Sequence, residues 1–170
     1  PGTSLVEQQA KLCGCDWLPV VTEGIAEEEV NDLKSALSNL QIDGIVSGAL
    51  RSDYQKTRLE RMCEDLAIKS FTPLWHQSSR SHMENLVANG FKVMITGVSS
   101  DGLGKEWLGC ILDDSSLERL TKLASEYRFH VDGEGGEYET LVVAGPHMKG
   151  ELSIDFDIEW DGVRGHLNFL

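Results

Sequence analysis

A compact apolar run at residues 42–49 is the feature that most constrains the fold. It has the form of a strand buried on both faces, as in a parallel sheet. A helix pattern precedes it, with Val30, Leu33, Leu37 and Leu40 in one stripe, and a second one follows from about Asp53. The second helix places four apolar residues on one face: Leu59, Met62, Cys63 and Leu66. This alternation predicts parallel pairing with right-handed crossovers.

The first residues fit the same scheme. Residues 4–13 are typical of the end of a helix closed by Gly14, and residues 17–21 of a short strand. The acidic residues 27–29 suit the first turn of the next helix, where carboxylates favour the helix dipole.

The pattern changes after Pro73-Leu74-Trp75. Ser81 and Glu84 have capping-box spacing for a short helix that ends at Gly90, and Ser115 and Glu118 repeat that spacing for a longer one. Residues 91–98 predict a strand between these helices. Residues 152–160 alternate apolar and polar side chains, so a strand with one buried face is expected. A hairpin turn at Asp161-Gly162 then returns the chain through residues 163–169. We therefore predict an α/β domain over residues 1–75, then a smaller mixed α+β domain over residues 76–170 with an antiparallel C-terminal hairpin.

The bulk composition excludes several functions. The 170 residues are 41% apolar and 25% charged, as in an ordinary soluble globule, and the formal net charge is −13. Such charge argues against direct contact with nucleic acid and against anionic membrane surfaces. We see no membrane-spanning stretch and no signal peptide. The four cysteines lack a second close pair, which favours reduced thiols in a cytoplasmic setting.

Residues 132–140 are the most informative about chemistry. Three glycines and four carboxylates share these nine positions, which read Asp-Gly-Glu-Gly-Gly-Glu-Tyr-Glu-Thr. Two like charges about 4 Å apart repel by roughly 4 kcal/mol at an effective dielectric constant of 20. A cation, a proton or a hydrogen-bond donor would offset that repulsion, so the loop is suited to receive an ammonium group, a metal or a proton. The alternative is a solvated acidic turn before a strand.

A second candidate lies where the run at residues 42–49 meets the helix beginning near Asp53. Ligands bind at the carboxyl ends of parallel strands, and Gly48 would let a ligand approach the backbone. Arg51 and Arg58 could hold phosphate oxygens. Alternatively, Asp53 only caps the helix and Arg58 is a surface charge. The five histidines show no metal-ligand spacing, and His76 beside Trp75 is typical of packing.

The motifs together resemble the diphthine–ammonia ligase family, within the N-type ATP pyrophosphatase group. The resemblance rests on residues 48–60, Pro73-Leu74-Trp75, residues 133–140 and Gly145-Pro146, and spans about two-thirds of the chain. It implies a HUP-like parallel sheet with helices on both faces, joined to a smaller domain that carries the acidic loop.

The resemblance also implies an activity. ATP, with Mg²⁺, would activate the diphthine carboxylate of translation elongation factor two as an acyl-adenylate, with release of pyrophosphate. Ammonia, taken up mostly as ammonium, would then displace AMP to give diphthamide. The implied catalytic residues are Glu134, Glu137 and Glu139. The implied nucleotide-binding residues are Gly48, Ala49, Ser52, Asp53, Gln55 and Arg58. The implied substrate-binding residues are Trp75, Gly135, Gly136, Tyr138 and Thr140, with Trp75 and Tyr138 offering a π face to a trimethylammonium group. No metal-binding residue is assigned, and a homo-oligomer is left open.

One departure bears on ATP. The Ser-Gly-Gly-x-Asp-Ser phosphate loop of the group has no counterpart in residues 1–30, so roughly the first 50 residues of the family pattern look missing. The chain as it stands is expected to bind ATP poorly and to be inactive alone. Two other functions stay open: a non-catalytic module that binds a cationic segment of a protein, and an ATP pyrophosphatase acting on another acceptor such as a tRNA base.

Overall fold

The computed structural model describes residues 3–25 and 28–170. Two compact units are present: one is Leu18–Gln77, and the other combines Ser78–Leu170 with the N-terminal residues up to Trp17. The sequence-based division between residues 75 and 76 falls close to the unit boundary, but it assigned the N-terminal helix to the other unit. None of the described helices has both the length and the apolar character needed to span a membrane.

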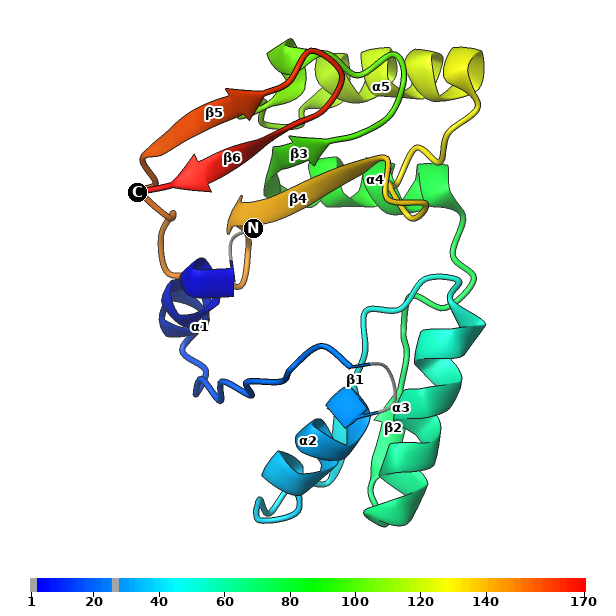
Figure 1. Cartoon of the computed structure of the whole chain (residues 1–170), viewed down its shortest axis with the longest axis vertical. Coiled ribbons are helices and arrows are strands. Elements are labelled where there is room, and N and C mark those ends of the chain that lie inside the picture. The colour runs from blue at the N-terminus through cyan, green and yellow to red at the C-terminus, as the bar shows by residue number, and fades with distance from the viewer. Residues whose placement is uncertain (1–2, 26–27) are drawn as a thin grey trace. The chain divides into compact units, whose positions relative to one another are not determined.

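The unit Leu18–Gln77 is a small parallel α/β arrangement. It contains α2 (Glu28–Leu37), β1 (Gly44–Val46), α3 (Asp53–Asp65) and β2 (Lys69–Phe71), in that order (Figure 1). The strands pair in parallel, with Gly44 opposite Lys69. Helix α3 packs against β2 and α2, and it buries Met62 and Cys63. The α/β class and the parallel pairing predicted from the sequence are confirmed.

Several expectations for this unit were wrong. The predicted strand over residues 42–49 is only three residues long, and Val46 is 71% exposed rather than buried. Among the described residues, β1 pairs only with β2, and an apolar run is buried on both faces only where other elements cover both faces of its sheet. Residues 17–21 form no strand, and Leu40 lies beyond the end of α2. The expected start of that helix at Glu27 falls outside the described residues.

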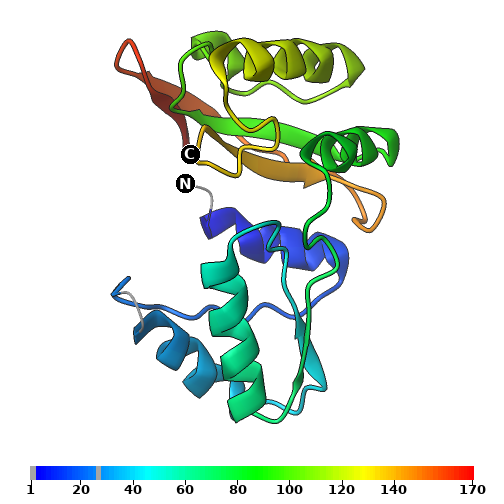
Figure 2. The same cartoon turned by 90° about the vertical axis from the view of Figure 1, so that its right-hand side faces the viewer.

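The second unit is built on an antiparallel sheet with strand order β4-β3-β6-β5 (Figures 1 and 2). Its elements are η1 (Thr3–Leu5), α1 (Val6–Cys13), α4 (Ser79–Ala88), β3 (Lys92–Val98), η2 (Lys105–Trp107), α5 (Asp114–Tyr127), β4 (Tyr138–Ala144), β5 (Phe156–Trp160) and β6 (Gly165–Phe169). The predicted strand at residues 91–98 and the predicted N-terminal helix closed by Gly14 are confirmed.

The two faces of this sheet have different cores. One face packs against α4 and α5 and contains Ile95, Trp107, Leu120 and Leu167, which are all almost fully buried. On the other face, Leu141 and Val143 of β4 pack with Leu5 and Leu152. Gln9 of α1 donates to the Val142 carbonyl (2.8 Å), so α1 and α5 lie on opposite sides of the sheet (Figure 2). Helix α1 therefore covers the β4 side of that second face.

The helix caps lie earlier than the spacing suggested. Ser78, not Ser81, caps α4, since its hydroxyl accepts from the Ser81 amide. Asp113, not Ser115, begins α5 in a capping box with Ser116. The last hairpin is confirmed, although β5 begins at Phe156 rather than Leu152. Its turn is held by the Asp161 carboxylate, which accepts from the amides of Val163 and Arg164 (2.8 and 2.7 Å).

Candidate functional site

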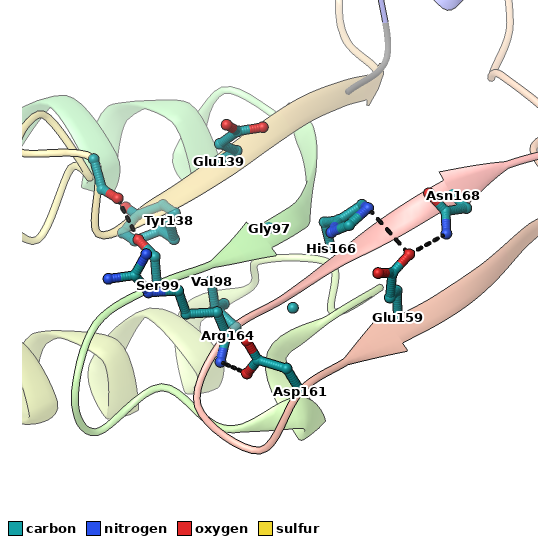
Figure 3. A pocket seen from close by; sticks show the side chains of 12 residues that line it. Gly97, Val98, Ser99, Tyr138, Glu139, Glu159, Asp161, Arg164, His166 and Asn168 are labelled. Carbon is teal, nitrogen blue, oxygen red and sulfur yellow. Dashed lines mark hydrogen bonds and ion pairs between the residues drawn. The ribbon is translucent and has the colours of Figure 1, made fainter.

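A pocket of about 590 Å³ lies on the open face of the four-stranded sheet (Figure 3). Every residue that lines it belongs to the unit that contains Ser78–Leu170. The lining residues are Gly97, Val98, Ser99, Gly136, Tyr138, Glu139, Glu159, Asp161, Arg164, Gly165, His166 and Asn168. The acidic loop and the C-terminal hairpin therefore contribute to one site, although they are far apart in the sequence.

Strand register explains why these side chains meet. Glu139 on β4 lies opposite Gly97 on β3, Gly97 lies opposite His166 on β6, and His166 lies opposite Glu159 on β5. Cross-strand partners project from the same face, so these residues form one row across the sheet. Gly97 leaves a gap in the row, because it has no side chain. Thr96 has no partner in the pairing of β3 with β4. This β-bulge brings Gly97 opposite Glu139.

The acidic loop is tied to the end of β3. The Ser99 hydroxyl donates to the Gly136 carbonyl (2.6 Å), and the Ser99 amide donates to the Glu137 carbonyl (2.9 Å). Gly133 and Gly136 have φ values of 72° and 82°. Side chains other than hydrogen are disfavoured at such angles, so the two glycines are needed for this loop path. Gly136 thus reaches the pocket, as its predicted substrate-binding role requires.

The predicted catalytic carboxylates occupy three different environments. Glu139 lines the pocket, whereas Glu134 is exposed on the loop outside it. Glu137 turns back on its own loop, where its Oε1 accepts from the His130 amide (2.8 Å). Its Oε2 is buried and has no hydrogen-bond partner among the described residues. Only Glu139 of the three is therefore placed to face a ligand in this pocket.

Tyr138 anchors the loop to the core. Its side chain is 5% exposed, and its hydroxyl donates to the Val131 carbonyl. Burial raises the pKa of Tyr138, and the nearby carboxylates of Asp132 and Glu137 raise it further. The buried ring leaves little of its π face for a trimethylammonium group. Gly135 and Thr140, also predicted to bind substrate, do not line the pocket, and Thr140 lies opposite Ile95 within the sheet.

The hairpin supplies residues that sequence reasoning did not single out. Glu159 Oε2 accepts from Asn168 Nδ2 (3.1 Å) and lies 3.7 Å from His166 Nε2. Arg164 extends from the turn toward Ser99 in Figure 3. The alternation over residues 152–160 already placed Glu159 on the wet face. The strand order that carries it to the acidic loop had no signal in the sequence.

The predicted nucleotide-binding residues lie in the other unit. Gly48 and Ala49 follow β1, and a side chain at Gly48 would meet no atom within 4 Å. The Ala49 amide bonds to Ser47 Oγ (3.3 Å). Ser52, rather than Asp53, caps α3, and its hydroxyl accepts from the Gln55 amide (3.3 Å). The backbone at Gly48, just after β1, therefore leaves room for a ligand to approach. Asp53 is the first residue of α3.

Arg58 and Trp75 have partners within their own unit. Arg58 and Gln55 line a pocket of about 310 Å³ between α2 and α3. Arg58 Nη1 bonds to Glu29 Oε1 (3.1 Å) and Tyr54 OH (2.6 Å). The Trp75 ring stacks on His76 at 4.6 Å, and Lys56 Nζ lies 5.2 Å from its centroid. A phosphate at Arg58 would have to compete with the carboxylate of Glu29.

Metal-binding geometry is absent from residues 3–25 and 28–170, which contain no group of three or more His, Cys, Asp or Glu side chains that could hold an ion. Carboxylates from β4, from β5 and from the hairpin turn line the pocket instead. The chemistry that this arrangement suits best is the recognition of an organic cation.

Comparison with known proteins gives the same family in both halves. Residues 1–70 match the family described as the diphthamide synthase N-terminal domain, and residues 78–169 match the diphthamide synthase C-terminal domain. The second match begins at the first residue of the C-terminal segment of the larger unit.

Curated relatives agree with these matches. The chain is 32% identical to a Danio rerio protein over 133 residues, which are 75% of this chain and 52% of the relative. It is 33% identical to a Homo sapiens protein over 133 residues, or 75% and 49% of the two chains. A Schizosaccharomyces pombe protein is 34% identical over 131 residues, or 74% and 22%. All three relatives are named diphthine–ammonia ligase.

The chain spans about half the length of the fish and human relatives that it matches. The C-terminal match alone takes in residues 78–169, more than half of the sequence. On these matches, the chain belongs to the diphthamide synthase family.

Proposed function

We propose that this chain forms part of a diphthine–ammonia ligase, and that the pocket on the antiparallel sheet holds the positively charged reactant. The observation that carries the proposal is the position of Glu139. It is the one predicted catalytic carboxylate that lines the pocket, and it shares that pocket with Glu159 and Asp161. Carboxylates held around a hollow favour a cation by direct charge attraction.

The proposed reaction has two steps. An oxygen of the diphthine carboxylate on translation elongation factor two attacks the α-phosphorus of ATP, and pyrophosphate leaves. Ammonia then attacks the carbonyl carbon of the acyl-adenylate, and AMP leaves with the oxygen electron pair. Because ammonium is the main form at neutral pH, a proton must be removed before ammonia is nucleophilic. A carboxylate near the reacting carbon is suited to accept that proton.

The fit to ATP is partial. The open backbone at Gly48 and Ala49, before the capped start of α3, suits the approach of a nucleotide at a strand end. Gln55 and Arg58 line a pocket close to that helix start, but Arg58 already bonds to Glu29. The phosphates would themselves supply most ligands of the Mg²⁺ that accompanies ATP.

The cytoplasm is the compartment in which we expect this reaction. All four cysteines are free thiols, as is usual in a reducing environment.

The test of the pocket uses the complete protein and the elongation factor that carries diphthine. Glu139→Gln removes one charge with little change of shape, and Asp157→Asn removes a charge from an exposed position of β5 that does not line the pocket. We expect Glu139→Gln to raise the KM for ammonium or for the factor roughly tenfold, as loss of a charge-assisted contact would. Asp157→Asn should behave like the unchanged protein. Equal kinetics for the two variants would remove Glu139 from the site.

Pyrophosphate release separates the ligase from the alternatives. A ligase releases pyrophosphate from ATP when the diphthine-bearing factor is added, and a binding module does not. An enzyme for another acceptor would release it only with that acceptor. No factor-dependent release by the complete protein would refute the proposed function.

The role of Arg58 requires a paired comparison, because Arg58 and Glu29 bond to each other. If Arg58 binds phosphate, Arg58→Ala weakens ATP binding, while Glu29→Gln leaves it unchanged or strengthens it by releasing the guanidinium. Equal losses from both variants would show that the pair only supports the α2–α3 packing.

A further inference from the structure

Two cysteines lie at the end of α1, separated by a single glycine. Cys13 is the last residue of the helix, and Cys15 follows Gly14, which has a φ of 68° and a ψ of 31°. Cys15 is exposed and Cys13 is partly exposed, so small reagents in solution reach both thiols. Neither cysteine lines the pocket on the four-stranded sheet, and the pair is therefore a site in its own right.

The backbone at Gly14 brings the two cysteines within the range of a disulfide bond. Its dihedral angles are close to the mirror image of helical ones, so the Cα atoms on either side of it are as far apart as residues i and i+2 of a helix, roughly 5.4 Å. Disulfide-bonded cysteines usually have Cα atoms about 4.4–6.8 Å apart. The Cys15 thiol already donates to the carbonyl oxygen of Cys13 (3.8 Å), so this sulfur lies beside its neighbour.

Backbone hydrogen bonds hold the pair in this arrangement. The amides of Gly14 and Cys15 donate to carbonyl oxygens of the last helical turn (3.1 and 2.9 Å), which is the closing pattern of a helix that ends at a left-handed glycine. The Lys149 amide donates to the Leu12 carbonyl (2.8 Å) and ties this turn to the segment after β4. The two thiols are therefore held close together by the folded helix end.

The other two cysteines differ from this pair. Cys63 is 1% exposed in α3, and burial raises the pKa of its thiol. Burial also raises the pKa of the Cys110 thiol, and the charge of Asp113 raises it further. A thiol must lose its proton before it attacks a disulfide, so Cys63 and Cys110 are poor nucleophiles.

A positive charge lies beside the pair. A Cβ at Gly14 would lie 3.7 Å from Lys149 Nζ, so the ammonium group is next to the residue that separates the two cysteines. Small disulfides of the glutathione type carry carboxylates. An ammonium group at the site favours their approach over that of neutral disulfides by charge attraction.

We propose that Cys13 and Cys15 form a reversible dithiol–disulfide site that reacts with small anionic disulfides of the glutathione type. The thiolate of one cysteine attacks a sulfur of the small disulfide, whose S–S bond breaks to give a mixed disulfide and one small thiolate. The thiolate of the other cysteine then attacks the protein sulfur of the mixed disulfide. The Cys13–Cys15 bond forms, and a second small thiolate leaves.

The exchange balances without any further reagent. The protein is oxidised by two electrons and loses two protons, and the small disulfide is reduced to two thiols. A disulfide that closes so short a ring is exposed and strained, so an excess of the small thiol reduces it again. Disulfides of this labile kind are typical of redox sensing in a reducing compartment.

A redox titration of the 170-residue chain tests the proposal. The chain is equilibrated with graded ratios of reduced to oxidised glutathione, the remaining thiols are alkylated, and each cysteine is assigned by peptide mass spectrometry. We expect Cys13 and Cys15 to become protected together, linked to each other, and to be released by excess reduced glutathione. In the folded reduced chain, Cys63 and Cys110 should be alkylated at least roughly tenfold more slowly than the pair. The absence of a Cys13–Cys15 bond at the most oxidising ratio would overturn the proposal.

Single substitutions separate the two steps of the exchange. Cys15→Ser should leave Cys13 as a persistent mixed disulfide with glutathione, because the second attack has lost its nucleophile, and Cys13→Ser should do the same at Cys15. Both positions reach solvent and serine is close in size to cysteine, so both variants should fold. Cys110→Ala is the matched control and should still form the Cys13–Cys15 bond. Mixed disulfides that persist equally in the unchanged chain would refute the intramolecular step.

Lys149→Gln tests the preference for an anionic reagent. The variant should react roughly twofold more slowly with oxidised glutathione and at an unchanged rate with neutral hydroxyethyl disulfide, a modest effect because Lys149 is exposed. Added salt should reduce the difference, since it screens exposed charges. An unchanged rate with oxidised glutathione would overturn the assignment of anionic disulfides as the reagents of this site.

Discussion

Substitution of Gly135 should change stability in opposite directions, depending on the residue at position 137. A Cβ on Gly135 would lie 2.6 Å from Glu137 Oε1, the oxygen that accepts from the His130 amide. Gly135 does not have a positive φ, so alanine is allowed by its backbone. The clash can be relieved only if the Glu137 carboxylate moves away from His130.

The change in the free energy of unfolding caused by Gly135→Ala is the sum of two opposing contributions. Loss of the hydrogen bond from the His130 amide to a partly exposed carboxylate costs about 1 kcal/mol. A glycine-to-alanine change at a compatible position stabilises by about 0.4–1 kcal/mol, because the unfolded chain loses freedom. Local repacking around the displaced carboxylate adds to the first term. Gly135→Ala should therefore destabilise the chain that has Glu137, and it should stabilise the Glu137→Ala variant.

A double-mutant cycle compares the unchanged chain, Gly135→Ala, Glu137→Ala and the double variant by urea denaturation. We expect a coupling energy between positions 135 and 137 of about 1–2 kcal/mol. The exchange rate of the His130 amide gives an independent measure, since it should rise in both single variants. Additive free energies of unfolding, with Gly135→Ala having the same sign in both backgrounds, would refute the proposed packing of Glu137 against Gly135.

Two further predictions concern titrating groups. Amide bonds from Ser116, then its hydroxyl, lower the pKa of Asp113, so this cap should add stability above pH about 4 and lose it as the pH falls through the folded-state pKa. Asp113→Asn should keep the cap and flatten the acid branch of a stability–pH profile, whereas Asp113→Ala should destabilise the chain at every pH. Identical acid branches for the unchanged chain and Asp113→Asn would contradict this prediction. Tyr138→Phe should cost about 1 kcal/mol at neutral pH, because the Val131 carbonyl loses its donor. Since burial raises the pKa of Tyr138, its contribution should be lost above pH about 10, and the variant should show a shallower alkaline decline in thermal unfolding than the unchanged chain.

Local patterns in the sequence predict the type and position of individual helices and strands better than they predict the burial of those elements. Gly14 marks the end of α1, and the period of two before Asp161 predicts the strand that enters the final hairpin. The apolar composition of the run at residues 42–49 predicts burial. In the structure Val46 is exposed, because burial depends on the elements packed over the faces of the sheet, which an apolar run does not specify.

The caps show how a local rule can select the wrong residue. Ser115 and Glu118 satisfy the usual capping-box spacing, yet Asp113 and Ser116 form the box. Ser116 replaces the usual Glu or Gln because its short hydroxyl reaches the Asp113 amide (2.7 Å). Two overlapping candidates were present, and packing of Leu117 and Leu120 against the sheet favoured the earlier start.

The acidic loop shows why a charge cluster in sequence need not be one in space. The repulsion among its carboxylates led us to expect a cation in the loop. In the structure Glu134 is exposed, Glu137 folds back onto the His130 amide, and Glu139 lies in a strand, on the face opposite the buried Tyr138. Backbone donors and strand alternation thus separate these charges without a ligand. The carboxylate of Glu159 lines the same pocket as Glu139, and it comes from the hairpin through the strand order β4-β3-β6-β5. The carboxylates that line this pocket are therefore brought together by sheet register rather than by loop composition, and strand register is not specified by a local charge cluster.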